Sequence, residues 1–177
     1  GLRLRVVERM YRMRFREPLP EGLTLEQVRG HEGHRMRQAY ADAADLHGVD
    51  WRGRNYDRTD WSGSDDPNRA LSAANACLNG VCHAAILSAG YSPGLGFIHQ
   101  GKQLSFVYDI ADLYKTKVTI PIAFATVAEE PLHLERTVRK RCRQAFRNAK
   151  LLKRILPDIE AVLDIEGDPP LPDGFDP

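Results

Sequence analysis

Two acidic residues and a histidine stand close together between positions 96 and 112, and their spacing predicts a site for a cation. Asp109 and Asp112 are three residues apart, so a helix that begins near Ser105 places both carboxylates on one face. His99 precedes that helix, on an expected loop. Two carboxylates in an apolar segment repel each other and lose hydration unless a metal ion or a basic side chain compensates them.

A further acid, Glu32, lies between two histidines. The zinc-protease pattern H-E-x-x-H needs its histidines four positions apart, whereas His31 and His34 are three apart. That class of protease is therefore disfavoured. Glu32 is better interpreted as an acid on a long helix, where the two flanking glycines, Gly30 and Gly33, predict close approach of other backbone or of a nucleic acid.

Four side chains together form a candidate catalytic site: Glu32, His99, Asp109 and Asp112. Carboxylate oxygens and one imidazole suit Mg²⁺ or Mn²⁺ better than zinc or copper. A divalent ion in such a site can polarise a phosphoryl group and stabilise charge on the attacking and leaving oxygens, so this set predicts phosphodiester chemistry. Lys102 and Lys115 flank the acids and could hold phosphates beside them.

Each of these residues has an ordinary explanation when it is taken alone. A glutamate on a helix is usually solvated, a loop histidine usually serves as a structural hydrogen-bonding group, and surface lysines usually serve solubility. Only the combination of the acids, the histidine and the lysines indicates a site.

The formal charge of +1 hides an uneven distribution along the chain. Residues 158–177 contain seven acids and no lysine or arginine, so the remainder of the chain carries +8. Its basic residues concentrate in the segments 3–16 and 136–154. This pattern predicts a polyanionic partner, with a set of solvated helix faces as the alternative.

Composition favours one globular domain. A chain of 177 residues with 42% hydrophobic content can bury a substantial core. Three cysteines, Cys77, Cys82 and Cys142, have neither an even number nor C-x-x-C spacing, so we expect buried, reduced thiols and no cysteine-based zinc site. No apolar run approaches the roughly 20 residues of a membrane span, and the first residues lack a secretion signal. We therefore expect a cytoplasmic protein that does not enter a membrane.

The apolar pattern predicts an all-α fold, a helical bundle that serves as a catalytic domain. A domain over residues 1–165 and a flexible, acidic, Pro-rich tail over 166–177 are expected. Thr24 and Gln27 have the spacing of a capping box. The expected helices cover residues 2–15, 25–47, 67–90, 105–115, 120–128 (opened by Pro121), 134–156 and, after a break at Pro157, 159–163.

Four segments carry a resemblance to a known family: residues 71–80, 84–93, 96–102 and 104–112. Together they closely resemble the CRISPR-associated integrase of the spacer-acquisition complex, subtype I-E. The resemblance runs from about residue 4 to residue 163. It covers the helical catalytic domain of that family, whereas the family's small N-terminal β-domain, which mediates much of the dimer contact, has no counterpart in this sequence.

The resemblance implies a metal-dependent DNA integrase and endonuclease that takes part in antiviral defence. Such an enzyme inserts short foreign DNA segments into a CRISPR array, as a DNA 3′-hydroxyl attacks a phosphodiester. Double-stranded DNA, a second and smaller CRISPR-associated adaptation protein, and a second copy of the chain in a homodimer are the implied partners.

The family's functional residues transfer to this sequence position by position. The resemblance implies that Glu32, His99 and Asp112 hold the divalent ion, Mg²⁺ or Mn²⁺, and that Asp109 supports the site. The implied DNA contacts are Lys102, Lys115, Arg29, Tyr56 and Tyr108.

Two alternatives from other classes stay open. In a non-catalytic helical DNA-binding or assembly module, the acids would form ion pairs with the many arginines, and no activity would depend on a divalent ion. A small-molecule metallohydrolase would ignore DNA altogether, and the basic composition does not favour it.

Overall fold

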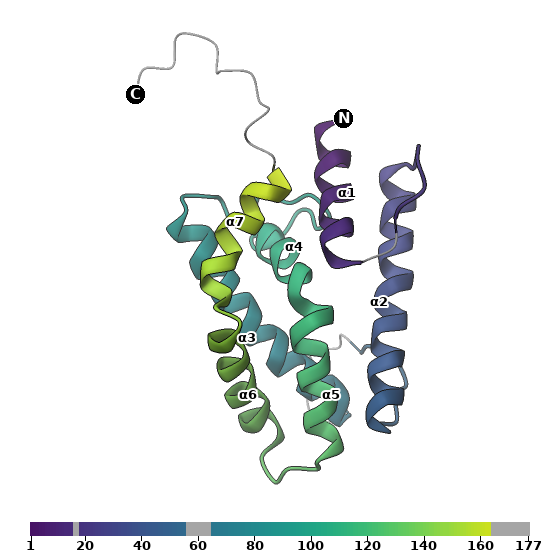
Figure 1. The fold of residues 1–177 in the computed structure, drawn as a ribbon, viewed down its shortest axis with the longest axis vertical. Helices are drawn as coiled ribbons and strands as arrows, with labels where there is room; N and C mark the ends of the chain where they lie inside the picture. The colour runs from purple at the N-terminus through teal and green to yellow at the C-terminus, as the bar shows by residue number, and fades with distance from the viewer. Residues whose placement is uncertain (16–17, 56–64, 164–177) are drawn as a thin grey trace.

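The computed structural model describes residues 1–15, 18–55 and 65–163, and this part of the chain forms a helical bundle without strands (Figure 1). The expected all-α fold is confirmed. Tyr56 and the expected tail over 166–177 lie outside the described residues. In chain order the helices are α1 (Leu2–Arg14), α2 (Leu25–His47), α3 (Asp66–Ser88), α4 (Ser105–Tyr114), the π-helix η1 (Lys115–Thr119), α5 (Ile120–Ala128), α6 (Leu134–Asn148) and α7 (Leu151–Leu163).

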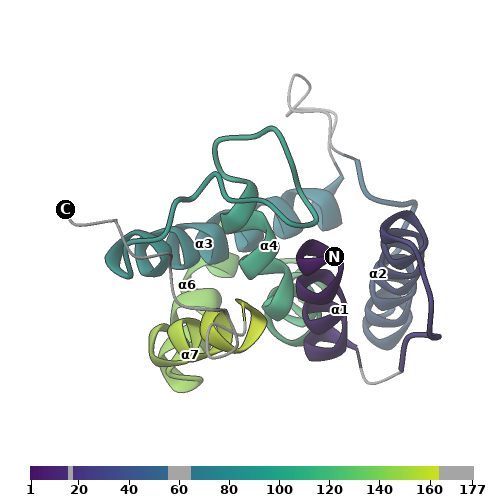
Figure 2. The same ribbon diagram turned by 90° about the horizontal axis from the view of Figure 1, so that it is seen from above.

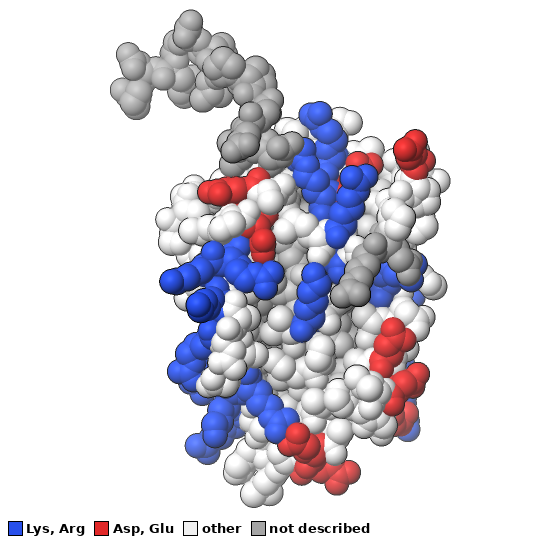
Figure 3. Space-filling view, in the orientation of Figure 1, with Lys and Arg blue, Asp and Glu red and all other residues white. Residues whose placement is uncertain are grey.

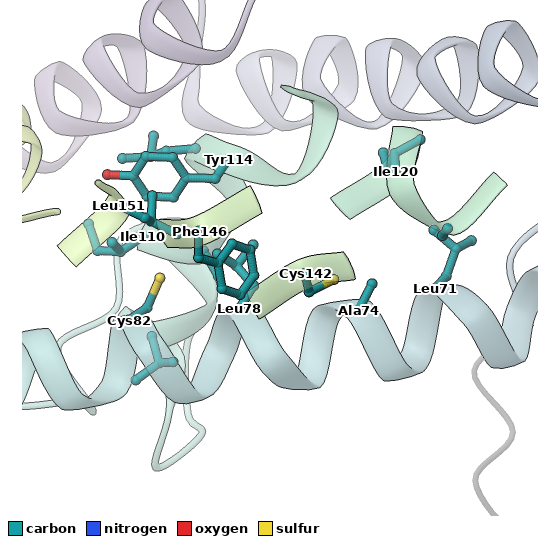
Figure 4. Close-up of a cluster of buried hydrophobic side chains, with 14 of the residues drawn as sticks. Leu71, Ala74, Leu78, Cys82, Ile110, Tyr114, Ile120, Cys142, Phe146 and Leu151 are labelled. Atoms are coloured by element: carbon teal, nitrogen blue, oxygen red, sulfur yellow. The ribbon is translucent and has the colours of Figure 1, made fainter. Parts of the chain in front are cut away.

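Helix α3 is the centre of the bundle and packs against α4, α5, α6 and α7. One face of α3 enters the core at spacings of three or four residues, and Figure 4 shows these side chains on the side where residues of α4, α5, α6 and α7 lie: Leu71, Ala74, Leu78 and Cys82. By length and composition α3 could also cross a membrane. Its packing on four other helices accounts for the apolar composition without a bilayer.

The cysteines lie largely where they were expected. Cys82 and Cys142 are buried and Cys77 is half-buried, and all three are free thiols. Burial raises the pKa of both Cys82 and Cys142 to about 12, so these thiols stay protonated at neutral pH.

The predicted bounds of α2 are confirmed, and so is the capping box at its start. The backbone N–H of Gln27 donates to Oγ1 of Thr24 at 3.3 Å, and the backbone N–H of Thr24 donates to Oε1 of Gln27 at 2.8 Å. At the other end, Gly48 adopts a left-handed conformation with φ of 64° and ends the helix.

No other backbone of the described chain comes close to the two glycines that flank Glu32, so the prediction of a close backbone approach is wrong, whereas the approach of a nucleic acid stays a prediction. A Cβ atom at Gly30 would meet nothing within 4 Å, and one at Gly33 would meet only Nη1 of Arg37, at 3.6 Å. The reason is the position of α2 at the edge of the bundle (Figure 1), where Gly30 faces solvent.

The predicted helix over residues 120–128 is confirmed as α5, with Pro121 in its first turn, but it continues directly from α4. The helical path from α4 continues through η1 into α5, and the N–H of Ile120 donates to the carbonyl of Lys115, the wider i→i+5 bond of a π-helix. The widened turn precedes Pro121, which has no N–H to donate. Helices α4 and α5 therefore form one helical rod, and Asp112 lies in the last turn of α4, just before the π-helix.

The basic segment is divided at Lys150, not at Pro157. Lys150 is left-handed with φ of 49° and separates α6 from α7. The last buried residue of α6, Phe146, precedes the first of α7, Leu151, by five positions, which would turn them to different faces of one continuous helix. The break lets both apolar faces pack inward, and Pro157 lies inside α7 on its exposed side.

Seen from above, α1 lies between α4 and α2 (Figure 2), and it contacts both helices. Its buried face carries Val6, Met10 and Arg14 at spacings of four residues. An arginine therefore occupies the next position of an apolar stripe, at the point where the first, second and fourth helices meet.

Candidate metal centre

Asp109 anchors the loop that precedes α4. Its side chain is fully buried and accepts hydrogen bonds from three successive backbone N–H groups: Phe97 at 2.7 Å, Ile98 at 3.1 Å and His99 at 2.9 Å. Nδ1 of His99 lies 2.7 Å from the same carboxylate. With four donors around its two oxygens, Asp109 has little capacity left for a metal ion.

Two arginines hold the opposite side of this loop. Nε and Nη2 of Arg3, on α1, donate to the carbonyl of Phe97 at 2.8 and 2.7 Å. Arg29, on α2, donates to the carbonyl of Ile98. The loop segment before His99 is thus fixed through its N–H groups by α4 and through its carbonyls by α1 and α2.

Gly96 fits this loop because it has no side chain. A Cβ atom there would lie 1.9 Å from the carbonyl oxygen of His99 and 2.7 Å from Cβ of Ser105. The first distance is far below any real contact, so only glycine allows the loop to pass this point.

Glu32 and Asp112 face the same buried cation. Arg14 has a fully buried side chain; its Nη1 pairs with Oε1 of Glu32, and its Nη2 lies 3.8 Å from Oδ2 of Asp112. Glu32 comes from α2, Arg14 from α1 and Asp112 from α4, so three helices bring their charged groups together.

Lys115 supplies a second positive charge. Its Nζ lies 2.5 Å from Oδ1 of Asp112, one turn along the same helical rod. Burial raises the pKa of the Asp112 carboxyl, but Lys115, Arg14 and His99 together lower it below its ordinary value. Asp112 is therefore ionised at neutral pH.

His99 is held in one orientation by Asp109. The hydrogen bond to Asp109 raises the pKa of His99, burial lowers it, and the charges of Asp112 and Asp109 raise it further, so that the net shift is upward. The ring of Tyr108 meets the His99 ring edge-on, with centroids 5.7 Å apart. Since Nδ1 is engaged, Nε2 is the nitrogen that could bind a ligand.

The structure brings the four predicted acid and histidine residues together as two pairs. Asp109 is joined to His99, and Glu32 is joined to Asp112 through Arg14. The charge of Asp112 also acts on His99, which links the pairs.

The predicted DNA contacts lie in different environments. Lys102 is exposed on the loop, whereas Lys115 pairs with Asp112, Arg29 bonds the loop and Tyr108 contacts His99. Tyr56 lies outside the described residues.

Sequence reasoning missed Arg3 and Arg14. The partner of Arg3 lies 94 residues away along the chain, and no local pattern predicts such a contact. Arg14 did leave a signal, because it continues the buried i, i+4 stripe of Val6 and Met10.

The donor set fits a hard divalent cation by its chemistry. Glu32 and Asp112 offer carboxylate oxygens, which pair with Arg14 and Lys115. His99 offers an oriented imidazole. Within residues 1–15, 18–55 and 65–163 no three acidic, histidine or cysteine side chains are yet gathered closely enough to hold an ion. Instead Arg14 and Lys115 compensate the acids.

The fold and the site together define an all-α domain with a carboxylate and histidine centre that is enclosed by basic side chains. The chain belongs to the CRISPR associated protein Cas1 family, whose model matches residues 5–161.

Named relatives are similar over nearly the whole chain. The CRISPR-associated endonuclease Cas1 of Geobacter sulfurreducens is 55% identical over 171 residues, which cover 96% of this chain and 56% of that protein. The CRISPR-associated endonuclease Cas1 of Escherichia coli K12 is 49% identical over 172 residues, 97% of this chain and 56% of the relative. The chain thus spans little more than half the length of these relatives.

A solved structure has the same fold. The crystal structure of a TtCas1–DNA complex superposes with a TM-score of 0.84 at 55% identity, and the match covers 99% of this chain and 62% of that one.

Proposed function

We propose that this chain is the helical part of a metal-dependent DNA integrase and endonuclease, similar to subtype I-E, that inserts short foreign DNA segments into a CRISPR array as part of antiviral defence. The observation that carries this proposal is the convergence of Glu32 and Asp112 on one buried cation, next to an oriented His99. Relatives at 49–55% identity carry the name endonuclease.

Glu32, His99 and Asp112 would hold the divalent ion, Mg²⁺ or Mn²⁺, and Asp109 would act by positioning His99 and its loop. When bound, the ion supplies charge stabilisation to the phosphoryl oxygens. In strand transfer the 3′-hydroxyl of a DNA end gives up its proton as its oxygen forms the new bond to phosphorus. The bond to the departing 3′-oxygen breaks and that oxygen takes up a proton, so the protons balance. Water in place of the 3′-hydroxyl makes the same reaction a hydrolysis.

Double-stranded DNA is the proposed substrate, and basic surfaces support this. Lys and Arg side chains gather along the edge formed by α6 and α7 (Figure 3). A groove of about 480 Å³ at the start of α6 is lined by both signs of charge, Arg136 and Arg139 among the basic residues and Asp66 and Glu135 among the acidic ones. If these basic side chains bind DNA phosphates, the affinity for DNA should fall steeply as the salt concentration rises.

Further partners are proposed from the family alone. They are a second copy of the chain in a homodimer and a second, smaller CRISPR-associated adaptation protein. The proposed location is the cytoplasm, where the DNA partner is found, with no membrane partner.

A non-catalytic helical DNA-binding or assembly module remains the second candidate. It is favoured by the pairing of Glu32 and Asp112 with Arg14, because such a module needs its acids only as partners for arginines.

One experiment separates the two candidates. A short labelled duplex is offered with a repeat-bearing plasmid to the full-length protein and its small partner, in Mn²⁺, in Mg²⁺ or in chelator. Joining that requires a divalent ion, disappears in Asp112→Ala and persists in the exposed control Asp45→Asn supports the integrase. DNA binding without joining in any ion supports the assembly module.

A further inference from the structure

Arg14 is an unusual neighbour for two acids that are proposed to hold a metal ion. Its guanidinium lies between Glu32 and Asp112, and its side chain is fully buried. A buried charge is costly unless it is paired and hydrogen-bonded. Here the pairing is incomplete, because Nε and Nη2 have no hydrogen-bond acceptor within the described parts of the chain.

The local charges already balance. Glu32 and Asp112 contribute two negative charges, while Arg14 and Lys115 contribute two positive charges in direct contact with them. A divalent ion added to this arrangement therefore meets repulsion from two cations at short range, which weakens its binding.

The two cations are held differently. Nζ of Lys115 lies 2.5 Å from Oδ1 of Asp112 on the same helical rod, and among the described residues it pairs with that acid alone. Arg14 reaches across from α1 and touches acids of both α2 and α4. Of the two, only Arg14 occupies the space between the proposed ligands.

The backbone leaves its helical path directly after Arg14. Arg14 is the last residue of α1, and Phe15 beyond it is extended, with φ of −120° and ψ of 140°. The guanidinium carbon lies 5.1 Å from the centroid of the Phe15 ring, which offers a second, cation–π contact.

We propose that Arg14 is a resident counter-cation of the metal centre, which holds Glu32 and Asp112 together before the ion binds and competes with the ion for them. This inference rests on the proposed function. Arg14 is a positioning residue: it sets how much free metal the site needs, and the position of α1 thereby controls the loading of the site.

The test is a calorimetric titration of the full-length protein with Mn²⁺ alone, without DNA. Arg14→Gln removes the competing charge, so we expect Mn²⁺ to bind at least about tenfold more tightly than to the wild-type protein. Arg12→Gln makes the same change at an exposed position of the same helix and should leave the affinity unchanged. In chelator, Arg14→Gln should also melt at a lower temperature, and Mn²⁺ should raise its melting temperature more than that of the wild-type protein.

Arg14→Lys is the second variant, in case Arg14→Gln does not fold. A lysine keeps the charge but lacks the fork that contacts both acids, so we expect Mn²⁺ affinity between those of the wild-type protein and Arg14→Gln. Affinity that is equal or weaker in the folded Arg14 variants would overturn the competition while leaving the metal centre intact. Absence of Mn²⁺ binding in the wild-type protein as well would overturn the proposed function together with this inference.

Discussion

Nδ1 of His99 lies 2.7 Å from Oδ1 of Asp109, and the same carboxylate accepts the backbone N–H groups of the loop that carries His99. One buried acid therefore determines both the path of the loop and the orientation of the imidazole. The two aspartates that are three residues apart have different tasks: Asp109 faces the loop, and Asp112 faces the cations.

Replacement of Asp109 by asparagine should damage stability and metal binding together. The amide would present an N–H₂ group to donors that need an acceptor, so we expect a loss of about 3 kcal/mol or more in the free energy of unfolding. Chemical denaturation checks this value, with the exposed Asp45→Asn as the control. If the denaturation midpoint of Asp109→Asn equals that of the wild-type protein, Asp109 does not anchor the loop.

Gly96→Ala should disturb the same loop from its other end. The new Cβ would overlap the carbonyl oxygen of His99, so the backbone must shift, at a cost of about 1–3 kcal/mol or more. Gly94→Ala is the matched control, because its nearest contact would be an ordinary 3.6 Å. Denaturation of both variants should show a clear loss only for Gly96→Ala, and equal losses would contradict the close contact.

Gly30→Ala should stabilise the protein. The position is helical and exposed, and a Cβ would meet no described residue within 4 Å, so alanine should gain about 0.5–1 kcal/mol from helix propensity alone. A thermal melt measures the gain. If stability rises while DNA binding falls, the glycine is kept for a nucleic acid that approaches α2 from solvent.

The thiols should react with a disulfide reagent in a fixed order at pH 8. Burial raises the pKa of Cys82 and Cys142 to about 12, whereas Cys77 is half-buried and Arg139 and Arg143 oppose its upward shift. We expect Cys77 to be labelled first and the other two only on unfolding. Mass spectrometry of the labelled peptides reads out this order, and early labelling of Cys82 would argue against its burial.

The same shifts predict a pH dependence of stability. The folded-state pKa values of Cys82 and Cys142 lie above the ordinary value of 9.0, so the unfolded chain releases these protons first. Their contribution is complete below pH 9 and is lost as the pH rises toward 12. Urea denaturation between pH 8 and pH 10 should show a falling free energy of unfolding, and a smaller fall in the Cys82→Ser variant.

Arg29→Gln separates a loop contact from a DNA contact. Because Arg29 donates to the carbonyl of Ile98, we expect its replacement to destabilise the protein by about 1–3 kcal/mol. If the residue contacts phosphate instead, its replacement should weaken DNA binding. The slope of log affinity against log salt concentration should then become shallower by about one unit. A salt titration of DNA binding alongside denaturation distinguishes the two roles.

Much of the fold could be predicted because its signals are local. The Thr24 and Gln27 pair marks the start of α2 within four residues of chain, and the small apolar residues of α3 show a helix covered by its neighbours. The end of α6 could not be predicted in this way, because a non-glycine residue, Lys150, takes the left-handed turn. At Lys150 the packing of two apolar helix faces outweighs the preference of a non-glycine residue for a negative φ.

The candidate site could be predicted only in part, because some of its contacts join residues that are far apart in the sequence. The spacing of Asp109 and Asp112 indicated a shared cation, but the sequence does not say that one acid turns toward backbone N–H groups. Of the two cations, Lys115 is three positions from Asp112, but Arg14 comes from α1 and is 98 positions from Asp112. Contacts across that separation follow from the packing of α1, which no spacing pattern encodes.

The π-helix between Lys115 and Thr119 gives the chain one place where its length can change. An α-helix turns by about 100° per residue, whereas the wider i→i+5 turn holds one residue more without rotating the helix that follows. Asp112 before this turn and Phe124 after it can therefore both keep their places, one in the site and one in the core. Deletion of one residue inside the turn should restore an ordinary helix, whereas the same deletion within α4 or α5 should rotate one part of the rod against the other. Sequences that diverge from this chain should therefore change in length at this turn more readily than elsewhere in α4 and α5.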